Sequence, residues 1–248
     1  MKQLSFHKKL RRSRKLVQDF IINNYKPIVL FSGGRDSLVV LHIVKTVAES
    51  IGIDDVTAIY ADTTVSTPGN LDYVKDVCKE LEVTLVVVKP EQDFFKLVEK
   101  WGFPTRTRRW CCYALKIKPI KDYLKTIEDN KVIFDGIRRN ESHKRRNYPE
   151  IGYHRHFKCP CCHVIFYWSS NDVRRYIEKY KLKENPLYRI FPRATECWCT
   201  AYKTANQFKA LKEHFPELFA KFVEAEAKLK TGGSALFKGG KKIYLRDL

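Results

Sequence analysis

The sequence predicts an α/β protein with a Rossmann-like, doubly wound parallel sheet and a smaller C-terminal lobe that is helical and cysteine-rich. Apolar, β-branched runs at residues 28–31, 56–60, 83–88 and 132–134 are separated by segments of helical period, which is typical of βαβ units. Beyond about residue 150 the pattern changes to short pieces rich in Cys, Pro and aromatic residues. This change indicates the second lobe.

The helices are predicted where apolar residues recur at helical spacing. The first ~25 residues place an apolar side, including Leu10 and Ile21, opposite a dense basic set from Lys8 to Lys15. Further helices are expected from Ser37 to about residue 48, over 71–81, and from Pro216, which suits a first helical turn. The expected organisation is a basic N-terminal helix at 1–25, a sheet domain at 26–150, a cysteine-rich helical lobe at 151–230 and a flexible basic tail at 231–248.

The chain is strongly basic, with 47 Lys and Arg against 28 Asp and Glu and a formal net charge of +19. A field of this sign attracts polyanions, so tRNA or another nucleic acid is one expected partner. The alternative is that part of the charge holds nucleotide phosphates while the rest solvates the surface. No stretch approaches the roughly 18 apolar residues of a membrane span, and the N-terminus lacks the apolar core of a signal peptide. We therefore expect a cytoplasmic protein without a membrane partner, and a homodimer stays open.

A glycine turn joins the first strand to the next helix in the stretch IVLFSGGRDSLVV. The glycines let the backbone turn tightly and approach an anion, while serine hydroxyls and the NH groups at the helix start donate hydrogen bonds. A binding site for a pyrophosphate-sized anion explains this arrangement better than a simple tight turn does. The predicted nucleotide-binding residues of the turn are Ser32, Gly33, Gly34, Arg35, Asp36 and Ser37.

This turn resembles the PP-loop of the adenine nucleotide α-hydrolase-like superfamily, the N-type ATP pyrophosphatases. The wider chain, from about residue 26 to 225, resembles the phosphoadenosine phosphosulfate (PAPS) reductase family. The resemblance includes YADTT at 60–64, RWCCYALK at 109–116, GIRRNES at 136–142, WSSNDV at 168–173 and NPLY at 185–188. It implies an adenine-nucleotide-binding PP-loop domain at 26–150, with ATP or PAPS as the substrate nucleotide and Mg²⁺ as a cofactor.

Charged residues follow two other strands at the same predicted edge of the sheet. Asp62 falls just past the second strand, where doubly wound sheets place ligand-contacting side chains, and a ribose or Mg²⁺ role and a turn-capping role both fit. Gly136 ends the VIFD strand and precedes a basic run whose arginines suit polyphosphate, or a solvated surface. The predicted nucleotide-binding residues here are Asp62, Gly136, Arg138, Ser142 and Arg145, with Asp36 and Arg138 also catalytic.

Most of the eight cysteines fall in tight groups, which in a reducing compartment favour a metal over disulfides. Arginines next to Cys111 and Cys112 favour thiolate, so this pair is also a candidate for catalysis. Four thiolates suit either Zn²⁺ or a [4Fe-4S] cluster, and spacing does not separate the two. In relatives that this chain resembles, an adjacent pair and a later CxxC can hold an iron-sulfur cluster, so the resemblance favours the cluster. The predicted ligands are drawn from Cys111, Cys112, Cys159, Cys162, Cys197 and Cys199.

Two enzymatic uses of the nucleotide pocket stay open. In the first, an acceptor oxygen attacks the α-phosphate of ATP, pyrophosphate leaves, and a sulfur donor then displaces AMP. In the second, a cysteine thiolate attacks the sulfur of PAPS or its unphosphorylated analogue, and a thiol reductant releases sulfite.

The assimilatory reductases that the chain resembles carry their nucleophile in a C-terminal Glu-Cys-Gly segment and tend to depart from SGGxDS. This sequence keeps SGGxDS and has no cysteine after Cys199. We therefore favour ATP-dependent sulfur transfer, with RNA as one acceptor. A nucleotide-sensing or RNA-binding module without turnover is the third alternative.

Overall fold

The computed structural model describes residues 4–192, 197–229, 236–238 and 241–248, and its contacts divide the chain into two compact units. Unit 1 comprises residues 1–60, 72–87 and 121–185, and unit 2 comprises residues 61–71, 88–120 and 186–248. Both units therefore combine separate stretches of chain, whereas the expected organisation divided the chain into four consecutive segments. Within the described ranges, no helix combines the length and apolarity needed to cross a membrane.

Unit 1 is built on a six-stranded sheet in the order β3-β2-β1-β4-β6-β5. β1 pairs in parallel with β2 and β4, β4 pairs in parallel with β6, and β5 is antiparallel to β6. The strands are β1 (Lys26–Leu30), β2 (Thr57–Ala61), β3 (Thr84–Val88), β4 (Lys131–Asp135), β5 (Ile151–His154) and β6 (Cys159–His163). The strand order reverses between β1 and β4, the place where doubly wound sheets bind ligands. The predicted fold class is confirmed.

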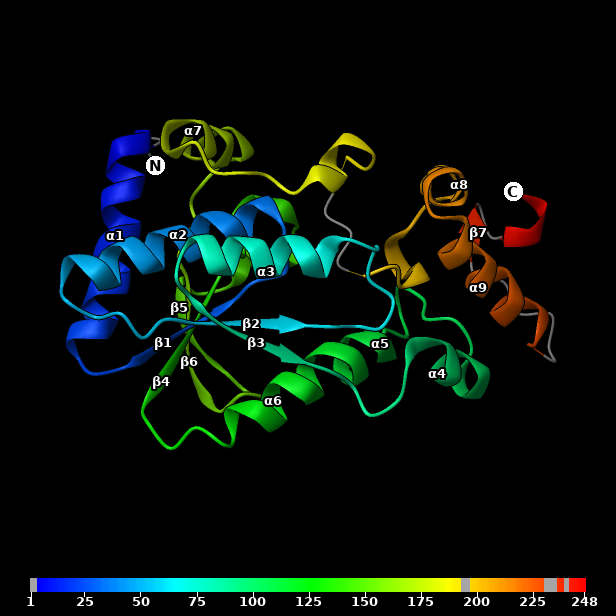
Figure 1. Ribbon diagram of the computed structural model, residues 1–248, viewed down its shortest axis with the longest axis horizontal. Helices are drawn as coiled ribbons and strands as arrows, with labels where there is room; N and C mark the ends of the chain where they lie inside the picture. Colours follow the sequence, from blue (N-terminus) through cyan, green and yellow to red (C-terminus); the bar gives the residue numbers. More distant parts are fainter. Residues whose placement is uncertain (1–3, 193–196, 230–235, 239–240) are drawn as a thin grey trace. The chain divides into compact units, whose positions relative to one another are not determined.

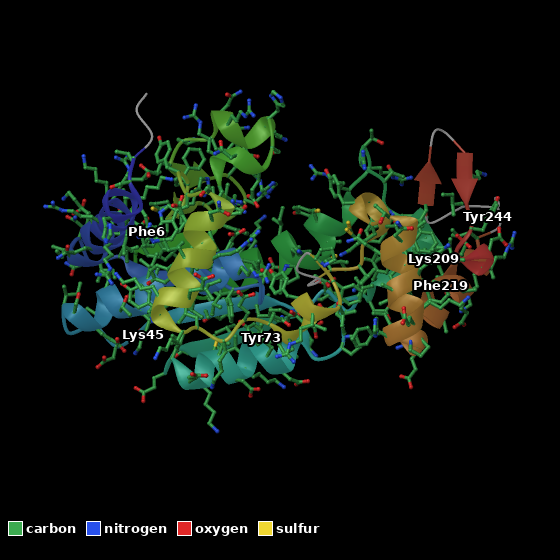
Figure 2. The ribbon with its side chains drawn as sticks, turned by 90° about the horizontal axis from the view of Figure 1, so that it is seen from above. Phe6, Lys45, Tyr73, Lys209, Phe219 and Tyr244 are labelled. Atoms are coloured by element: carbon green, nitrogen blue, oxygen red, sulfur yellow. The ribbon has the colours of Figure 1, made fainter. Side chains whose placement is uncertain are left out.

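Helices α1 (Phe6–Ile22), α2 (Arg35–Ser50) and α7 (Ser170–Tyr180) pack together over this sheet, as Figure 1 shows. α2 is apolar on most sides because it lies among the sheet, α1 and α7, and Val39, Leu41 and Val44 have no exposed surface. Helix α3 (Asn70–Glu80) carries Tyr73, labelled in Figure 2, whose ring centroid lies 6.4 Å from that of Phe31. The predicted helices after β1 and over residues 71–81 are thus present.

Helix α1 is attached to unit 1 by polar contacts that its apolar pattern does not reveal. Lys9 is only 6% exposed, and its Nζ lies 2.6 Å from Oδ2 of Asp172. The buried Ser13 hydroxyl donates to the Val164 carbonyl oxygen at 2.6 Å and accepts a hydrogen bond from the Trp168 indole at 3.0 Å. A lysine and a serine therefore belong to the buried face of a helix whose other side is basic.

Unit 2 encloses its own aromatic core, in which Phe94, Trp198, Phe208 and Phe222 have no exposed surface. Pro216 begins α9, as predicted from its preference for the first helical turn. The elements of unit 2 are α4 (Phe94–Trp101), α5 (Trp110–Cys112), α8 (Ala205–His214), α9 (Pro216–Ala227), β7 (Leu236–Lys238) and β8 (Lys241–Ile243). Helix α6 (Lys118–Leu124) passes from unit 2 into unit 1.

Two segments differ from the expected organisation. Residues 151–154 and 159–163 form β5 and β6 of the main sheet rather than part of a helical lobe, because the CPCC segment continues the sheet beside β4. In the expected flexible tail, the described residues form a β7–β8 hairpin and a final turn at Leu245–Asp247. Leu245 is fully buried, and its NH donates to the Glu226 carboxylate at 2.7 Å, so apolar burial orders this part of the tail.

Candidate functional site

The phosphate loop lies in unit 1, between β1 and α2 at the carboxyl edge of the sheet. Gly33 has a φ of +81°, in the left-handed region that favours glycine, and Gly34 is the N-cap of α2. The Ser37 hydroxyl donates to the Gly34 carbonyl oxygen at 2.9 Å, while the Ser32 NH donates to the Ser37 oxygen at 3.3 Å. The two serines therefore brace the turn from inside, at the start of a 16-residue helix whose N-terminus favours an anion.

Glu184 and Asn185, the last two residues of unit 1, contact this loop from outside. The buried Asn185 amide donates to the Gly33 carbonyl oxygen at 3.2 Å. The Arg35 Nε lies 2.5 Å from Oε2 of Glu184, and both side chains are about one-third exposed, at 33% and 32%. Arg35 thus lies in an ion pair. Neither its partner Glu184 nor Asn185 was among the predicted site residues, although NPLY was one of the segments of the resemblance.

Asp36 and Arg138 meet where the strand order reverses. The Arg138 Nε lies 3.0 Å from Oδ1 of Asp36, and its NH2 group donates to Oδ2 at 3.2 Å. The NH1 group donates to the Ser170 hydroxyl at the first turn of α7 at 3.2 Å. Burial raises the pKa of Asp36 above its ordinary value, although the Arg138 cation opposes this shift. A half-buried carboxylate with a raised pKa beside an arginine is typical of a functional site.

The end of β4 comes so close to Asp36 that position 136 has no room for a side chain. A Cβ at position 136 would lie 2.9 Å from the Asp36 carbonyl carbon, closer than real Cβ contacts come. The absence of a side chain therefore lets the end of β4 touch the first turn of α2 and brings Arg138 within reach of Asp36.

Gly136→Ala is expected to displace Asp36 and Arg138 from each other. We expect a loss of about 1–3 kcal/mol in the free energy of unfolding, as for other overpacked sites, together with weaker binding of the nucleotide that the loop is predicted to hold. Chemical denaturation and calorimetric titration with ATP measure the two effects. Gly152→Ala on β5 is the control, because the nearest atom to its Cβ is a side-chain atom, Cγ of Pro149, at 3.0 Å. Equal effects of both variants would contradict the assignment.

The remaining predicted nucleotide-binding residues have local partners. Ser142 accepts a hydrogen bond from the Arg145 NH at 3.3 Å, and the Arg145 guanidinium pairs with Glu141. Asp62 belongs to unit 2, where Oδ1 accepts the Thr64 NH at 3.0 Å and Oδ2 lies 3.3 Å from the Lys89 ammonium. Asp62 thus has the turn-capping contact that the sequence allowed, and its nucleotide role stays a prediction.

Unit 2 brings together the thiols of Cys111, Cys112, Cys197 and Cys199, here called the thiol group. Trp198 explains the spacing of the second pair. Its NH donates to the Val65 carbonyl oxygen at 2.9 Å, and its buried indole donates to the Thr67 hydroxyl at 2.7 Å. Residues two apart in an extended segment point to the same side, so Cys197 and Cys199 share one side of this segment, and both pack against the aromatic core that contains Trp198.

The first pair lies on α5, which continues through a π-helical turn at Tyr113–Ile117 into α6. Such turns are frequent at functional sites. Thiol hydrogen bonds from Cys111 and Cys197 lower the pKa of Cys199, and one from Cys111 lowers the pKa of Cys112. The same hydrogen bonds, together with burial, raise the pKa of Cys111. The Lys116 ammonium adds to the preference for thiolate at Cys112 and Cys199.

The other predicted ligands, Cys159 and Cys162, lie on β6 in unit 1. Successive side chains of a strand alternate between the faces of a sheet, so these two thiols point to opposite faces. Burial raises the pKa of both. His163, next in the strand, has its Nδ1 2.7 Å from Oδ1 of Asp135. In the part of the chain that the structure describes, no three His, Cys, Asp or Glu side chains are already arranged around a common metal position.

The comparisons with known proteins agree with this architecture. An uncharacterized protein of Methanocaldococcus jannaschii is 34% identical over 206 residues, which are 81% of this chain and 47% of that protein. The chain thus spans about half the length of this curated relative. An adenosine 5'-phosphosulfate reductase of Bacillus mycoides is 25% identical over 187 residues, 70% of this chain and 73% of that protein.

Among solved structures, a PAPS reductase from Candida auris has a TM-score of 0.57 at 18% identity, over 75% of this chain and 88% of that one, which shows a shared fold. A family model for the phosphoadenosine phosphosulfate reductase domain matches residues 26–193. This match extends from β1 through the phosphate loop and Arg138 to the residues that hold the loop. The chain therefore belongs to the phosphoadenosine phosphosulfate reductase domain family.

Proposed function

We propose that the protein is an AMP-forming ATP pyrophosphatase that activates an acceptor, such as a tRNA base, for sulfur transfer. The observation that carries this proposal is the complete SGGRDS loop. Its left-handed Gly33 and internally braced serines present a helix N-terminus to an anion, and Asp36 lies beside Arg138 at the same edge. This arrangement suits both the binding of a pyrophosphate and the stabilisation of charge on the phosphate being cleaved.

The chemistry assigns a separate task to each part of the loop. The acceptor carbonyl oxygen attacks the α-phosphorus of ATP, and the bond from that phosphorus to the bridging oxygen of pyrophosphate breaks. The loop amides receive the leaving pyrophosphate, and Arg138 stabilises the negative charge that develops on the α-phosphate. Asp36 would hold Mg²⁺, a hard cation that prefers carboxylate oxygens. A sulfur nucleophile then attacks the acceptor carbon, and AMP leaves with its oxygen.

The thiol group of unit 2 fits a metal by the chemistry of its donors. Four cysteine sulfurs, two of them with a lowered pKa, are the ligands that a [4Fe-4S] cluster or Zn²⁺ takes. Cys111, Cys112, Cys197 and Cys199 would hold it, and a bound iron-sulfur cluster would supply a site for sulfide. The cationic Lys116 and Arg109 would help to keep the thiols deprotonated for ligation.

A second function is favoured by the lowered pKa of Cys199 and by the similarity to adenosine 5'-phosphosulfate reductases. In this function a thiolate attacks the sulfur of the sulfonucleotide, the bond from that sulfur to the AMP phosphate oxygen breaks, and AMP leaves. A second thiol then attacks the cysteine sulfur of the thiosulfonate, and sulfite leaves as a disulfide forms. This function requires no pyrophosphate release.

The test is release of pyrophosphate from ATP by anaerobically purified protein, with and without total tRNA. We expect release that tRNA stimulates, because an acceptor is needed to capture the α-phosphate. PAPS and adenosine 5'-phosphosulfate are assayed in parallel for sulfite. Sulfite formation without pyrophosphate release under any condition would overturn the proposal and establish the reductase.

A further inference from the structure

We propose that unit 1 binds the phosphate backbone of an RNA in a groove between α1 and α7, here called the basic groove. The groove has a cavity volume of about 490 Å³, and its lining includes His7, Arg11, Arg14, Lys15, Lys179 and Tyr180. Among the described residues that line it, none is acidic. This inference rests on the proposed function, because it names where the RNA acceptor is held.

Two cations of the basic groove, Arg11 and Lys179, differ in their partners from other cations of α1, whereas Lys15 of the groove lies 3.2 Å from Asp19. Arg12 pairs with Glu150 outside the groove, and Lys9 is neutralised by Asp172 beneath the helix. Within the described chain, by contrast, neither Arg11 nor Lys179 is in an ion pair. A solvated surface would intersperse charges of both signs, whereas a hollow with positive charge alone concentrates the potential that attracts a polyanion.

The aromatic residue in the groove is held between two cations. The Arg14 guanidinium donates to the Tyr180 hydroxyl at 3.1 Å, and the Lys179 ammonium lies 5.4 Å from the centre of the Tyr180 ring. The ring of Tyr180 also packs against Tyr176 and His42, with centroids 4.4 Å and 5.2 Å apart. Tyr180 therefore offers its hydroxyl rather than a free ring face, beside cations that neutralise the phosphates of a nucleic acid backbone.

Helix α7 relates the groove to the phosphate loop within unit 1. Lys9 contacts Asp172 near the start of α7 and Arg14 contacts Tyr180 at its end, so side chains of α1 reach both ends of α7. Ser170, which accepts the hydrogen bond from Arg138, therefore lies roughly 15 Å from Tyr180 along α7, at 1.5 Å per residue. An RNA strand in the groove can thus extend toward the helix end that contacts Arg138.

The burial of the apolar side of α1 argues against a membrane surface as its partner. An interfacial helix inserts its apolar side between lipids. In α1 that side is occupied, because Leu10, Val17 and Ile21 are buried in unit 1. Apart from Ile22 at the end of the helix, which is 61% exposed, the basic side is left to meet a partner, and a charged surface of this kind suits an RNA backbone.

The test is binding of a fluorescein-labelled tRNA transcript to the full chain, measured over a series of salt concentrations. The double variant Arg11→Gln/Lys179→Gln is expected to weaken binding about tenfold or more and to flatten the salt dependence by about one to two phosphate contacts. Arg155→Gln is the control, since Arg155 is also exposed but lies on the β5–β6 turn. It should bind as the wild type does.

Three results would overturn the proposal. One is unchanged binding by the double variant, and another is a loss of binding free energy in Arg155→Gln that is about half as large, the share that one charge in place of two would have if net charge alone attracted the RNA. The third is equal competition by a DNA duplex of the same length. All variants change exposed side chains, so their unfolding temperatures should match the wild type. The test measures RNA binding and does not depend on the reaction. If the wild type never releases pyrophosphate but the double variant loses RNA binding, the proposed RNA site stands and the proposed reaction is refuted.

Discussion

Replacing Asp36 with Asn should reduce pyrophosphate release from ATP by about 100-fold or more, the size of effect seen when one preorganised group is removed from a reaction centre. The amide keeps the shape of the carboxylate but loses the charge that would hold Mg²⁺ and that pairs with Arg138. A coupled assay of pyrophosphate, with saturating ATP and tRNA, measures the effect. Asp72→Asn, in the exposed first turn of α3, is the matched control and should keep full activity.

The stability of Asp36→Asn separates chemistry from folding. Because the folded-state pKa of Asp36 is raised, the ionised group opposes folding, and wild-type stability falls as pH rises from the ordinary pKa of 3.8 through the folded value. The variant should lack this dependence and should melt no lower than the wild type at neutral pH. A variant that loses its activity and its unfolding temperature together would show that Asp36 supports the fold rather than the reaction.

If the thiol group holds the proposed metal, replacing Cys199 with Ala should remove that metal while leaving the phosphate loop intact. Loss of one of four ligands is expected to lower bound iron or zinc by about tenfold or more, since even groups behind the ligands alter affinity by that much. Elemental analysis after anaerobic purification gives both metals, and the tRNA-stimulated release of pyrophosphate should persist. In the reductase alternative the same variant would instead abolish sulfite formation.

Cys159→Ala is the counterpart on β6 and tests the other ligand set that the sequence suggested. It should retain its metal, because the thiol group holds four cysteines without it. Metal loss in Cys159→Ala but not in Cys199→Ala would assign the ligands to the strand cysteines. Retention in both would refute a cysteine-held metal.

The sequence predicted the local parts of the site because local chemistry determines them. A glycine turn between a buried strand and a helix shows itself in thirteen consecutive residues, IVLFSGGRDSLVV, and the structure places Gly33 in the left-handed region accordingly. Gly136 and Arg138 could be predicted from the sequence for the same reason, because they closely follow a strand. The helix from Pro216 followed from the preference of proline for a first turn.

Contacts between distant parts of the chain could not be predicted in this way. Asn185 holds Gly33 across 152 residues, and Ser170 reaches Arg138 across 32, so neither has a signature in its own neighbourhood. The CPCC segment suggested a metal lobe by composition, yet its neighbours in space are β4 and β5. Composition reports what a segment contains, whereas strand pairing depends on which other segment lies beside it.

The attachment of α1 limits how this protein can be divided. A basic N-terminal helix suggests a segment that can be removed without damage to the rest. In α1, however, Lys9 and Ser13 lie on the buried face and contact Asp172, Val164 and Trp168. A chain that began after residue 25 would leave the Asp172 carboxylate and the Trp168 indole without these partners and would uncover apolar surface on α2. Helix α1, which carries the positive charge, therefore belongs to the same folded unit as the sheet. A chain without α1 would be unsuitable for separating RNA binding from catalysis.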